Sequence, residues 1–151
     1  MDKRGKFIVI DGMDGSGKGT QIKLLREKLA GKNVIFTREP GGSPRAEEIR
    51  TMLLSANGTP STPSCDFFLF WAARASHIES VVEPARETGT YVICDRYDSS
   101  TYAFQIYGEQ QEMLLPVPSC LVTFTLPDPL RELARSHQKL LYTTLFRASA
   151  A

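Results

Sequence analysis

The chain has 151 residues, 42% of them hydrophobic and 23% charged, which suits one globular domain with a buried core. A formal net charge of +1 argues against a bulk nucleic-acid binder, and no apolar run is long enough to span a membrane. The first apolar run stops at Asp11, so we expect no signal peptide. The three cysteines, Cys65, Cys94 and Cys120, are odd in number and widely spaced, which indicates buried free thiols in the cytoplasm and not disulfides or a zinc site.

Apolar runs and helical patterns alternate along the chain. We expect strands at residues 7–10, 33–37, 90–94 and 121–126. We expect helices at residues 20–30, 45–54, 66–87, 101–115 and 130–146, with a polar loop at 55–64. Pro84 either kinks the third helix or opens another, and Gly108 interrupts the fourth. The alternation predicts an α/β fold with an open, mostly parallel sheet, in which the wholly apolar strand 7–10 is central.

A Gly-x-x-x-x-Gly-Lys motif runs from Gly12 to Lys18, between the first strand and the first helix. Glycines let backbone N–H groups point at an anion, the helix start adds its positive dipole end, and Lys18 supplies a mobile charge. Gly19 stands where Ser or Thr usually follows the lysine to hold Mg²⁺, and Thr20 comes one residue later. We therefore expect a nucleotide phosphate site made by Gly12, Asp14, Gly15, Ser16, Gly17, Lys18, Gly19 and Thr20.

Charged residues follow the ends of the second and third strands. Asp95 ends an apolar strand, as the Mg²⁺-binding Asp of nucleoside triphosphatases does, so Thr20 and Asp95 are the candidate metal residues. Arg96 could stabilise charge on a moving phosphoryl group, or form an ordinary surface salt bridge. Arg38 could bind a second phosphate, or be a solvated loop charge.

Phe70 and Arg74 are four residues apart and share a helix face. This spacing suits a ring that stacks on a base and a guanidinium that contacts the edge of the base. The alternative is that Arg74 only braces the helix, through Glu79 or Glu83.

Together these motifs resemble the thymidylate kinase family, which transfers the γ-phosphoryl group of ATP to dTMP. The matching runs are residues 12–18, 37–42, 69–77 and 95–105, in the order and spacing of the family. The likeness covers residues 7–126. It implies a P-loop NTPase-like three-layer fold. It also implies an enzyme that uses ATP and Mg²⁺.

The resemblance also implies a role for each matching residue. Lys18, Arg96 and Asp14 would be catalytic, and Asp14 would also bind the deoxyribose 3′-hydroxyl. Arg38 and Arg96 would hold the dTMP phosphate, while Phe70 would stack on thymine and Arg74 would contact its carbonyl edge. The base pocket would be lined by Ser100, Thr101 and Gln105, with Phe104 against the sugar.

After residue 126 the likeness fades into a divergent helical tail, residues 127–151, within the single domain that we expect for residues 1–151. Family members are usually longer, so the last family strand is expected to be absent. Residues 136–151 show no clear arginine-rich lid, although family members with Gly at the position of Gly15 rely on a lid arginine. Candidates by proximity are Arg131, Arg135 and Arg147.

The leading hypothesis is thus a cytoplasmic dTMP kinase with no nucleic-acid or membrane partner. The alternatives are a nucleotide-binding protein with little activity, or a kinase for another deoxynucleotide or for a deoxynucleoside. The family resemblance implies a homodimer. The aromatic-rich third helix agrees, because Phe67 and Trp71 add more apolar surface than one helix face can bury. We nevertheless expect both side chains to belong to the core. His77, on that helix, is expected to lie on the surface or to form a hydrogen bond, not to bind a metal.

Overall fold

The computed structural model describes residues 4–55 and 60–114. The chain divides into two compact units, Met1–Glu112 and Met113–Ala151, and the fold below is that of the first unit. Several expectations lie outside the described residues. They are the strand at 121–126, the helix at 130–146, the tail at 127–151, Cys120, and the lid candidates Arg131, Arg135 and Arg147.

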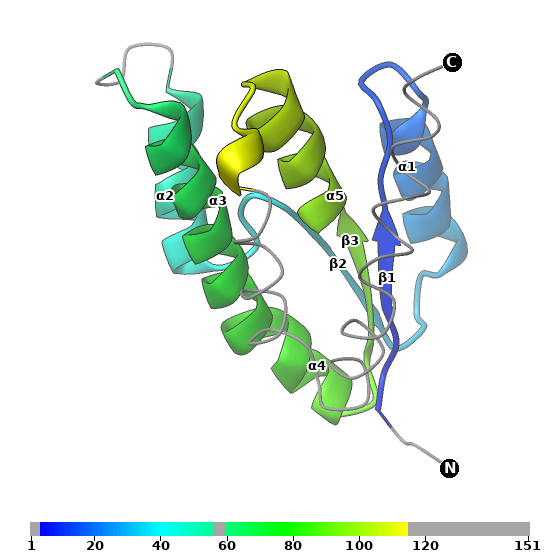
Figure 1. Cartoon of the computed structure of the whole chain (residues 1–151). Coiled ribbons are helices and arrows are strands. Elements are labelled where there is room, and N and C mark those ends of the chain that lie inside the picture. Colours follow the sequence, from blue (N-terminus) through cyan, green and yellow to red (C-terminus); the bar gives the residue numbers. More distant parts are fainter. Residues whose placement is uncertain (1–3, 56–59, 115–151) are drawn as a thin grey trace, which may run out of the picture. The chain divides into compact units, whose positions relative to one another are not determined.

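Three parallel strands form the sheet, in the order β1-β3-β2. Their bounds are Phe7–Ile10 for β1, Val34–Arg38 for β2 and Tyr91–Asp95 for β3. Ile10 and Arg38 are both in register with Asp95, so the carboxyl ends of all three strands meet at one edge (Figure 1). Backbone bonds extend this alignment past the strands, from Arg96 N–H to Ile10 O at 3.0 Å and from Glu39 N–H to Asp95 O at 2.9 Å.

β3 is the central strand, and its Val92, Ile93 and Cys94 are buried. Among the described strands β1 pairs with β3 alone, and the expected strand 121–126 lies outside the described residues, so the central place of strand 7–10 stays a prediction. Ile8 and Val9 of β1 are 41% and 37% exposed, because no described strand covers its other edge.

The helices are α1 Lys18–Lys28, α2 Pro44–Leu54, α3 Pro63–His77, α4 Glu83–Glu87 and α5 Asp98–Thr101, with π-helical segments at Ile78–Val82 and Tyr102–Gly108 and a 3₁₀ turn at Glu112–Leu114. α1 and α5 begin two and three residues before the expected positions of 20 and 101. α3 begins inside the expected loop, because Thr62 caps it and Pro63 suits a first turn. Pro84 opens α4, and the chain leaves the helical path just after Gly108, as expected.

The contact between α2 and α3 contains part of the core, with Ala46 and Ile49 of α2 packed near Ala73 of α3. Phe67 and Trp71 are 0% and 5% exposed, which confirms that they belong to the core. The idea that they leave surplus apolar surface for a partner is therefore wrong.

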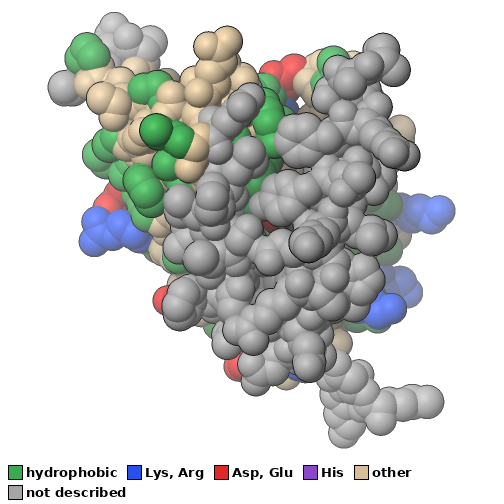
Figure 2. Space-filling model, in the orientation of Figure 1, with side chains coloured by type: hydrophobic (Ala, Val, Ile, Leu, Met, Phe, Trp, Pro, Cys, Tyr) green, Lys and Arg blue, Asp and Glu red, His purple; other side chains and the backbone are tan. Residues whose placement is uncertain are grey.

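Other hydrophobic side chains of these two helices are exposed, namely Met52, Leu54 and Phe68. Figure 2 shows hydrophobic side chains over this pair of helices, at the upper left of the view. Cys94 is buried as expected, whereas Cys65 near the start of α3 is exposed, contrary to expectation. None of the described helices is long and apolar enough to cross a membrane.

Candidate active site

The loop between β1 and α1 has the geometry of an anion site. Gly15 and Gly17 have φ values of 79° and 82°, in the left-handed region that glycine adopts without strain. The first intrahelical bond of α1 runs from Gln21 N–H to Gly17 O at 3.0 Å, so the N–H groups of residues 18–20 have no partner within the helix. No side chain caps this end and no acidic residue lies in the first turn. The free donors and the helix dipole therefore favour an anion here.

Lys18 and Asp95 face each other where α1 and β3 meet. Lys18 Nζ lies 3.6 Å from Asp95 Oδ1, which is buried and makes no hydrogen bond with any described residue. An orphaned carboxylate oxygen of this kind fits a magnesium ion bound through water. Thr20, the other expected metal residue, is exposed on the first turn of α1. The described residues contain no group of three or more metal-ligating side chains.

Arg96 joins the end of β3 to the phosphate loop. Its φ is 70°, a strained conformation for a residue with a side chain. Nη2 donates to Asp14 Oδ1 at 2.5 Å, and Nη1 donates to Ser100 Oγ at 2.9 Å. The guanidinium carbon also lies 5.4 Å from the centre of the Phe104 ring. These contacts hold the side chain of Arg96 at three points. The alternative, an isolated surface salt bridge, would supply only one.

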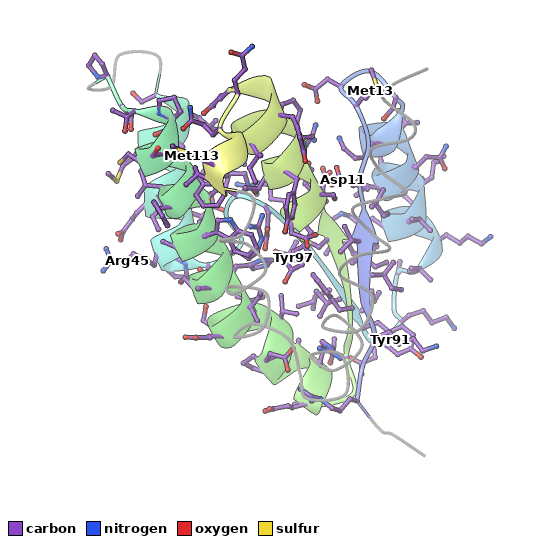
Figure 3. The ribbon with its side chains drawn as sticks, in the orientation of Figure 1. Asp11, Met13, Arg45, Tyr91, Tyr97 and Met113 are labelled. Atoms are coloured by element: carbon purple, nitrogen blue, oxygen red, sulfur yellow. The ribbon has the colours of Figure 1, made fainter. Side chains whose placement is uncertain are left out.

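Asp11 is a residue of this site that sequence reasoning did not single out. Figure 3 shows it just beyond β1, on the side of α5. Burial alone would raise its pKa. Hydrogen bonds from Ser99, Gly12 N–H and Ser100 and the charge of Arg96 outweigh burial, so the pKa of Asp11 lies below its ordinary value of 3.8. The available signal was its position directly after β1, at the same sheet edge as Arg96.

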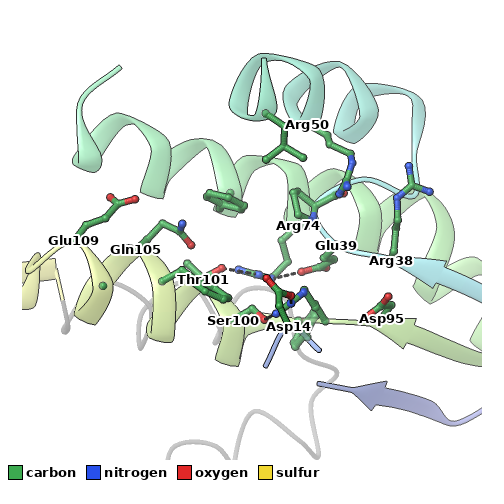
Figure 4. Close-up of a pocket in the computed structure, with 17 residues that line it drawn as sticks. Asp14, Arg38, Glu39, Arg50, Arg74, Asp95, Ser100, Thr101, Gln105 and Glu109 are labelled. Atoms are coloured by element: carbon green, nitrogen blue, oxygen red, sulfur yellow. Dashed lines mark hydrogen bonds and ion pairs between the residues drawn. The ribbon is translucent and has the colours of Figure 1, made fainter. Parts of the chain in front are cut away.

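A cavity of about 650 Å³ opens beside this cluster. All of the residues expected to bind the acceptor nucleotide line it, namely Asp14, Arg38, Phe70, Arg74, Arg96, Ser100, Thr101, Phe104 and Gln105. The cavity is also lined by Glu39, Pro40, Arg50, Leu54, Asp95, Tyr97, Gly108 and Glu109. Figure 4 shows Gln105 and Glu109 toward one end, Arg38 and Asp95 toward the other, and Arg74 between them.

Arg74 is the buried cation of this cavity, with 2% of its surface exposed. Its Nε donates to Glu39 Oε2 at 2.7 Å and its Nη2 donates to Thr101 Oγ1 at 2.9 Å. Nη1 is also buried but makes no hydrogen bond with any residue that the structure describes. The alternative that Glu79 or Glu83 pairs with Arg74 is therefore wrong, since the paired carboxylate is that of Glu39, in the loop after β2.

Arg38 ends β2 at the opposite end of the cavity. About half of its side chain is exposed, and Nη2 lies 2.9 Å from Glu47 Oε2, so Arg38 is a partly solvated charge in an ion pair. Arg50 of α2 donates to Pro40 O at 2.7 Å and holds the same loop. Sequence reasoning missed Glu47 and Arg50 because their roles depend on how α2 packs beside this loop.

Glu109 lies at the rim of the cavity, near the base-lining Gln105. Burial and the charge of Asp66 raise the pKa of Glu109, and a hydrogen bond from Gln105 offsets only part of this effect.

Comparisons with known proteins agree on one family. The model of the thymidylate kinase family matches residues 10–139. Thymidylate kinase of Geotalea daltonii is 49% identical over 106 residues, which cover 69% of this chain and 50% of that protein. Thymidylate kinase of Pelotomaculum thermopropionicum is 46% identical over 129 residues, which cover 83% of this chain and 60% of that protein.

Solved structures give the same answer. The crystal structure of thymidylate kinase from Ehrlichia chaffeensis superposes with a TM-score of 0.71 at 30% identity, over 89% of this chain and 87% of that one. Thymidylate kinase from Candida albicans gives a TM-score of 0.57 at 28% identity, over 67% and 44%. The chain spans about half the length of the curated relatives it matches. Its motifs, its α/β fold and these matches show that the chain belongs to the thymidylate kinase family.

Proposed function

We propose that this protein transfers the γ-phosphoryl group of ATP to dTMP and forms dTDP. One observation carries the proposal. One cavity is lined by Arg38 and Arg96, which would bind an acceptor phosphate, and by the buried Arg74, which has an unused donor. Asp95 also lines this cavity and lies 3.6 Å from Lys18 of the phosphate loop. Arg38 and Arg96 would pair with a phosphomonoester in such a cavity, and Arg74 would donate to the edge of a base.

The phosphate loop is the proposed site of ATP. The N–H groups of residues 18–20 would bind phosphate oxygens, and Lys18 would exchange its contact with Asp95 for the outer phosphates. Asp95 would hold Mg²⁺ through water, and the ion would neutralise charge on the phosphates when bound. The work of the residues themselves is positioning and charge balance, with no covalent intermediate.

Arg38 and Arg96 are the proposed ligands of the dTMP phosphate. Both are held by carboxylates of exposed residues, Glu47 and Asp14, whose side chains are 42% and 88% exposed. Exposed pairs of this kind contribute little free energy, so a bound phosphate can replace one carboxylate contact at low cost. Asp14 would then accept a hydrogen bond from the 3′-hydroxyl of the sugar.

The remaining cavity suits a pyrimidine. The half-buried Phe70 offers a ring face from α3, and Ser100, Thr101 and Gln105 offer polar groups from the opposite wall. Arg74 Nη1 would donate to a base carbonyl.

A second candidate function is nucleotide binding with little turnover, because the expected lid arginines lie outside the described residues. The experiment is an assay of ADP formation with ATP, Mg²⁺ and dTMP, dUMP, dCMP or thymidine, together with calorimetric binding of each. The panel is broad because the similar Candida albicans enzyme is described as having broad substrate specificity. We expect turnover of dTMP and no use of thymidine, which lacks the phosphate that Arg38 and Arg96 would bind. Binding of dTMP without turnover would instead favour the second candidate, and failure to bind dTMP would overturn both.

We also propose that the chain forms a homodimer through α2 and α3. Met52 and Phe68 on these helices are 64% and 50% exposed, and a partner copy would bury them. Light scattering at micromolar concentration should report twice the mass of one chain. A monomer at that concentration would rule the dimer out.

A further inference from the structure

A chain of buried hydrogen bonds runs from β2 to Arg74 and Thr101 in the wall of the cavity, and nothing above gives it a function. Thr37 Oγ1 of β2 lies 2.7 Å from His77 Nε2, and His77 Nδ1 lies 3.1 Å from Glu39 Oε1. Glu39 Oε2 then accepts from Arg74 Nε, and Arg74 Nη2 donates to Thr101. His77 is 0% exposed and Glu39 is 5% exposed, so His77 is a buried, hydrogen-bonded residue and not a surface residue.

Each oxygen of Glu39 is committed to one partner. A carboxylate only accepts hydrogen bonds, so Nδ1 of His77 carries its hydrogen and donates to Oε1. The bond to Thr37 holds the opposite side of the imidazole ring. Glu39 is therefore fixed from behind by His77, and it fixes Arg74 in front.

Gly42 closes this chain from the side. A Cβ atom on Gly42 would come within 2.4 Å of Thr37 Oγ1 and 2.7 Å of His77 Nε2, and its φ of 86° also favours glycine. The loop backbone thus packs directly against the Thr37–His77 bond. A side chain at this position would displace the Thr37 hydroxyl or the imidazole, so the bond between them requires glycine here.

The arrangement determines what Arg74 can bind. Glu39 offsets the charge of Arg74 and Thr101 takes Nη2, so one donor group, Nη1, remains for a ligand. We propose that Glu39, backed by His77 and Thr37, is a positioning residue that directs Arg74 Nη1 at a base carbonyl and prevents Arg74 from acting as a second phosphate site. This inference rests on the proposed function, because it concerns selection among nucleotides at the same cavity.

The other cations of the cavity differ in this respect. Arg38 pairs with Glu47 and Arg96 pairs with Asp14, whose side chains are 42% and 88% exposed, and a phosphate can replace either carboxylate. Asp11, at 3.6 Å, is a second and less exposed counter-ion of Arg96. The side chains of Arg74 and Glu39 are 2% and 3% exposed, and separating a buried pair leaves an uncompensated charge. The burial of its partner therefore distinguishes Arg74 from Arg38 and Arg96.

Glu39→Gln tests the role of the charge without changing the shape of the side chain. The amide oxygen can still accept from Arg74 Nε, and the amide nitrogen can donate to His77 if the hydrogen of the imidazole moves to Nε2. The fold should therefore survive, while Arg74 loses its compensating charge and its fixed direction. Thr37→Val is a milder second variant, since it removes only the hydroxyl group that holds His77. Glu48→Gln is the matched control, because Glu48 forms an exposed pair with Arg45 away from the cavity.

The experiment measures calorimetric dissociation constants of the full chain for dTMP, dCMP and inorganic pyrophosphate, with thermal melting to verify folding. The exocyclic amino group of cytosine presents a donor where thymine presents a carbonyl, so wild type should prefer dTMP. We expect Glu39→Gln to reduce the ratio of the dCMP and dTMP constants about tenfold, Thr37→Val to reduce it about threefold, and Glu48→Gln to leave it unchanged. Pyrophosphate should bind Glu39→Gln more tightly than wild type.

The outcomes separate this inference from the function beneath it. If wild type binds no dTMP, the proposed function falls and the inference falls with it. If wild type prefers dTMP but the ratio is the same in folded Glu39→Gln and Thr37→Val, the function stands and the positioning role is wrong. Equal weakening of dTMP and dCMP binding would likewise show only structural support by Glu39.

Discussion

Arg96 Nη2 lies 2.5 Å from Asp14 Oδ1, although the two residues are 82 positions apart in the sequence. The contact exists because β1 and β3 are parallel neighbours in register, so the segments that follow them leave the sheet side by side. This ion pair therefore joins the end of β3 to the phosphate loop, as the Lys18–Asp95 pair does. Since Asp14 is 88% exposed, the pair is weak and can open when a phosphate binds.

Replacement of either cation that faces this junction should nearly abolish phosphoryl transfer. We expect Lys18→Ala and Arg96→Ala each to cost about 3–4 kcal/mol of barrier, a loss in kcat of about 10²–10³-fold, because each removes a positioned donor for phosphate charge. The measurement is kcat with ATP and dTMP, alongside circular dichroism to show that the fold persists. Lys23→Ala, an exposed lysine of α1, is the matched control. Activity within a few-fold of wild type in either site variant would contradict the assignment.

The left-handed backbone conformation of Arg96 leads to a prediction about stability. Its φ of 70° costs about 1–2 kcal/mol for a residue with a Cβ atom, whereas glycine adopts it freely. Glycine loses more chain entropy on folding, which offsets about 0.5–1 kcal/mol of this gain. We therefore expect Arg96→Gly to be more stable than Arg96→Ala by about 0.5–1 kcal/mol in urea unfolding, although both are inactive. If Arg96→Ala is equally or more stable, the left-handed conformation is not retained.

Arg74→Lys should weaken base selection while preserving the buried charge. A lysine ammonium group is a point charge without the fork of the guanidinium, so it cannot contact Glu39, Thr101 and a base at once. We expect the dTMP to dCMP ratio of kcat/KM to fall about tenfold. Arg45→Lys, at an exposed position of α2, should leave the ratio unchanged. An unaltered ratio in Arg74→Lys would mean that the base is read elsewhere.

The outline of the sheet could be predicted because its signals are local. The expected strands 33–37 and 90–94 differ from β2 and β3 by one residue at each end, since each apolar run is bounded by turn-forming or charged residues. The charged residues at the strand ends could be predicted to cluster at one edge of the sheet, because the strands are parallel. Arg38 and Asp95 are indeed in register there. The helix starts were less accurate, because a glycine cap before Lys18 and a Thr-Pro start at Thr62 give weak signals in a polar context.

The charge partners inside the site could not be predicted in the same way. The pairing of Arg74 with Glu39 depends on how α3 packs against the loop after β2, and helix spacing alone suggested Glu79 or Glu83 instead. Glu83 in fact pairs with Arg86, three residues further along. The sequence predicted which side chains share the cavity, but their partners were set by packing between elements far apart in the chain.

Two aspartates near Arg96 should make opposite contributions to stability as pH changes. Burial, partly offset by Arg74 and by the Ser99 N–H, raises the pKa of Asp98 above its ordinary value of 3.8. The folded chain then binds more protons than the unfolded chain above pH 3.8, so this contribution to stability is lost as the pH rises through the folded pKa. Asp11 has a lowered pKa, so its contribution is present above pH 3.8 and is lost only as the pH falls below that value.

The corresponding test compares the melting temperatures of Asp98→Asn, Asp11→Asn and wild type from pH 5 to pH 8. Asparagine keeps the Oδ1 atom that accepts from Ser99 N–H at residue 98, so Asp98→Asn removes the desolvated charge and keeps the bond. We expect Asp98→Asn to melt above wild type, by a margin that grows as the pH rises towards the folded pKa of Asp98 and is constant above it. Asp11→Asn should melt below wild type by a margin that is constant over this range, because Asp11 is fully ionised throughout. A margin for Asp98→Asn that shrinks with rising pH would show that Asp98 is stabilised as a carboxylate by Arg74, and that burial does not govern its ionisation.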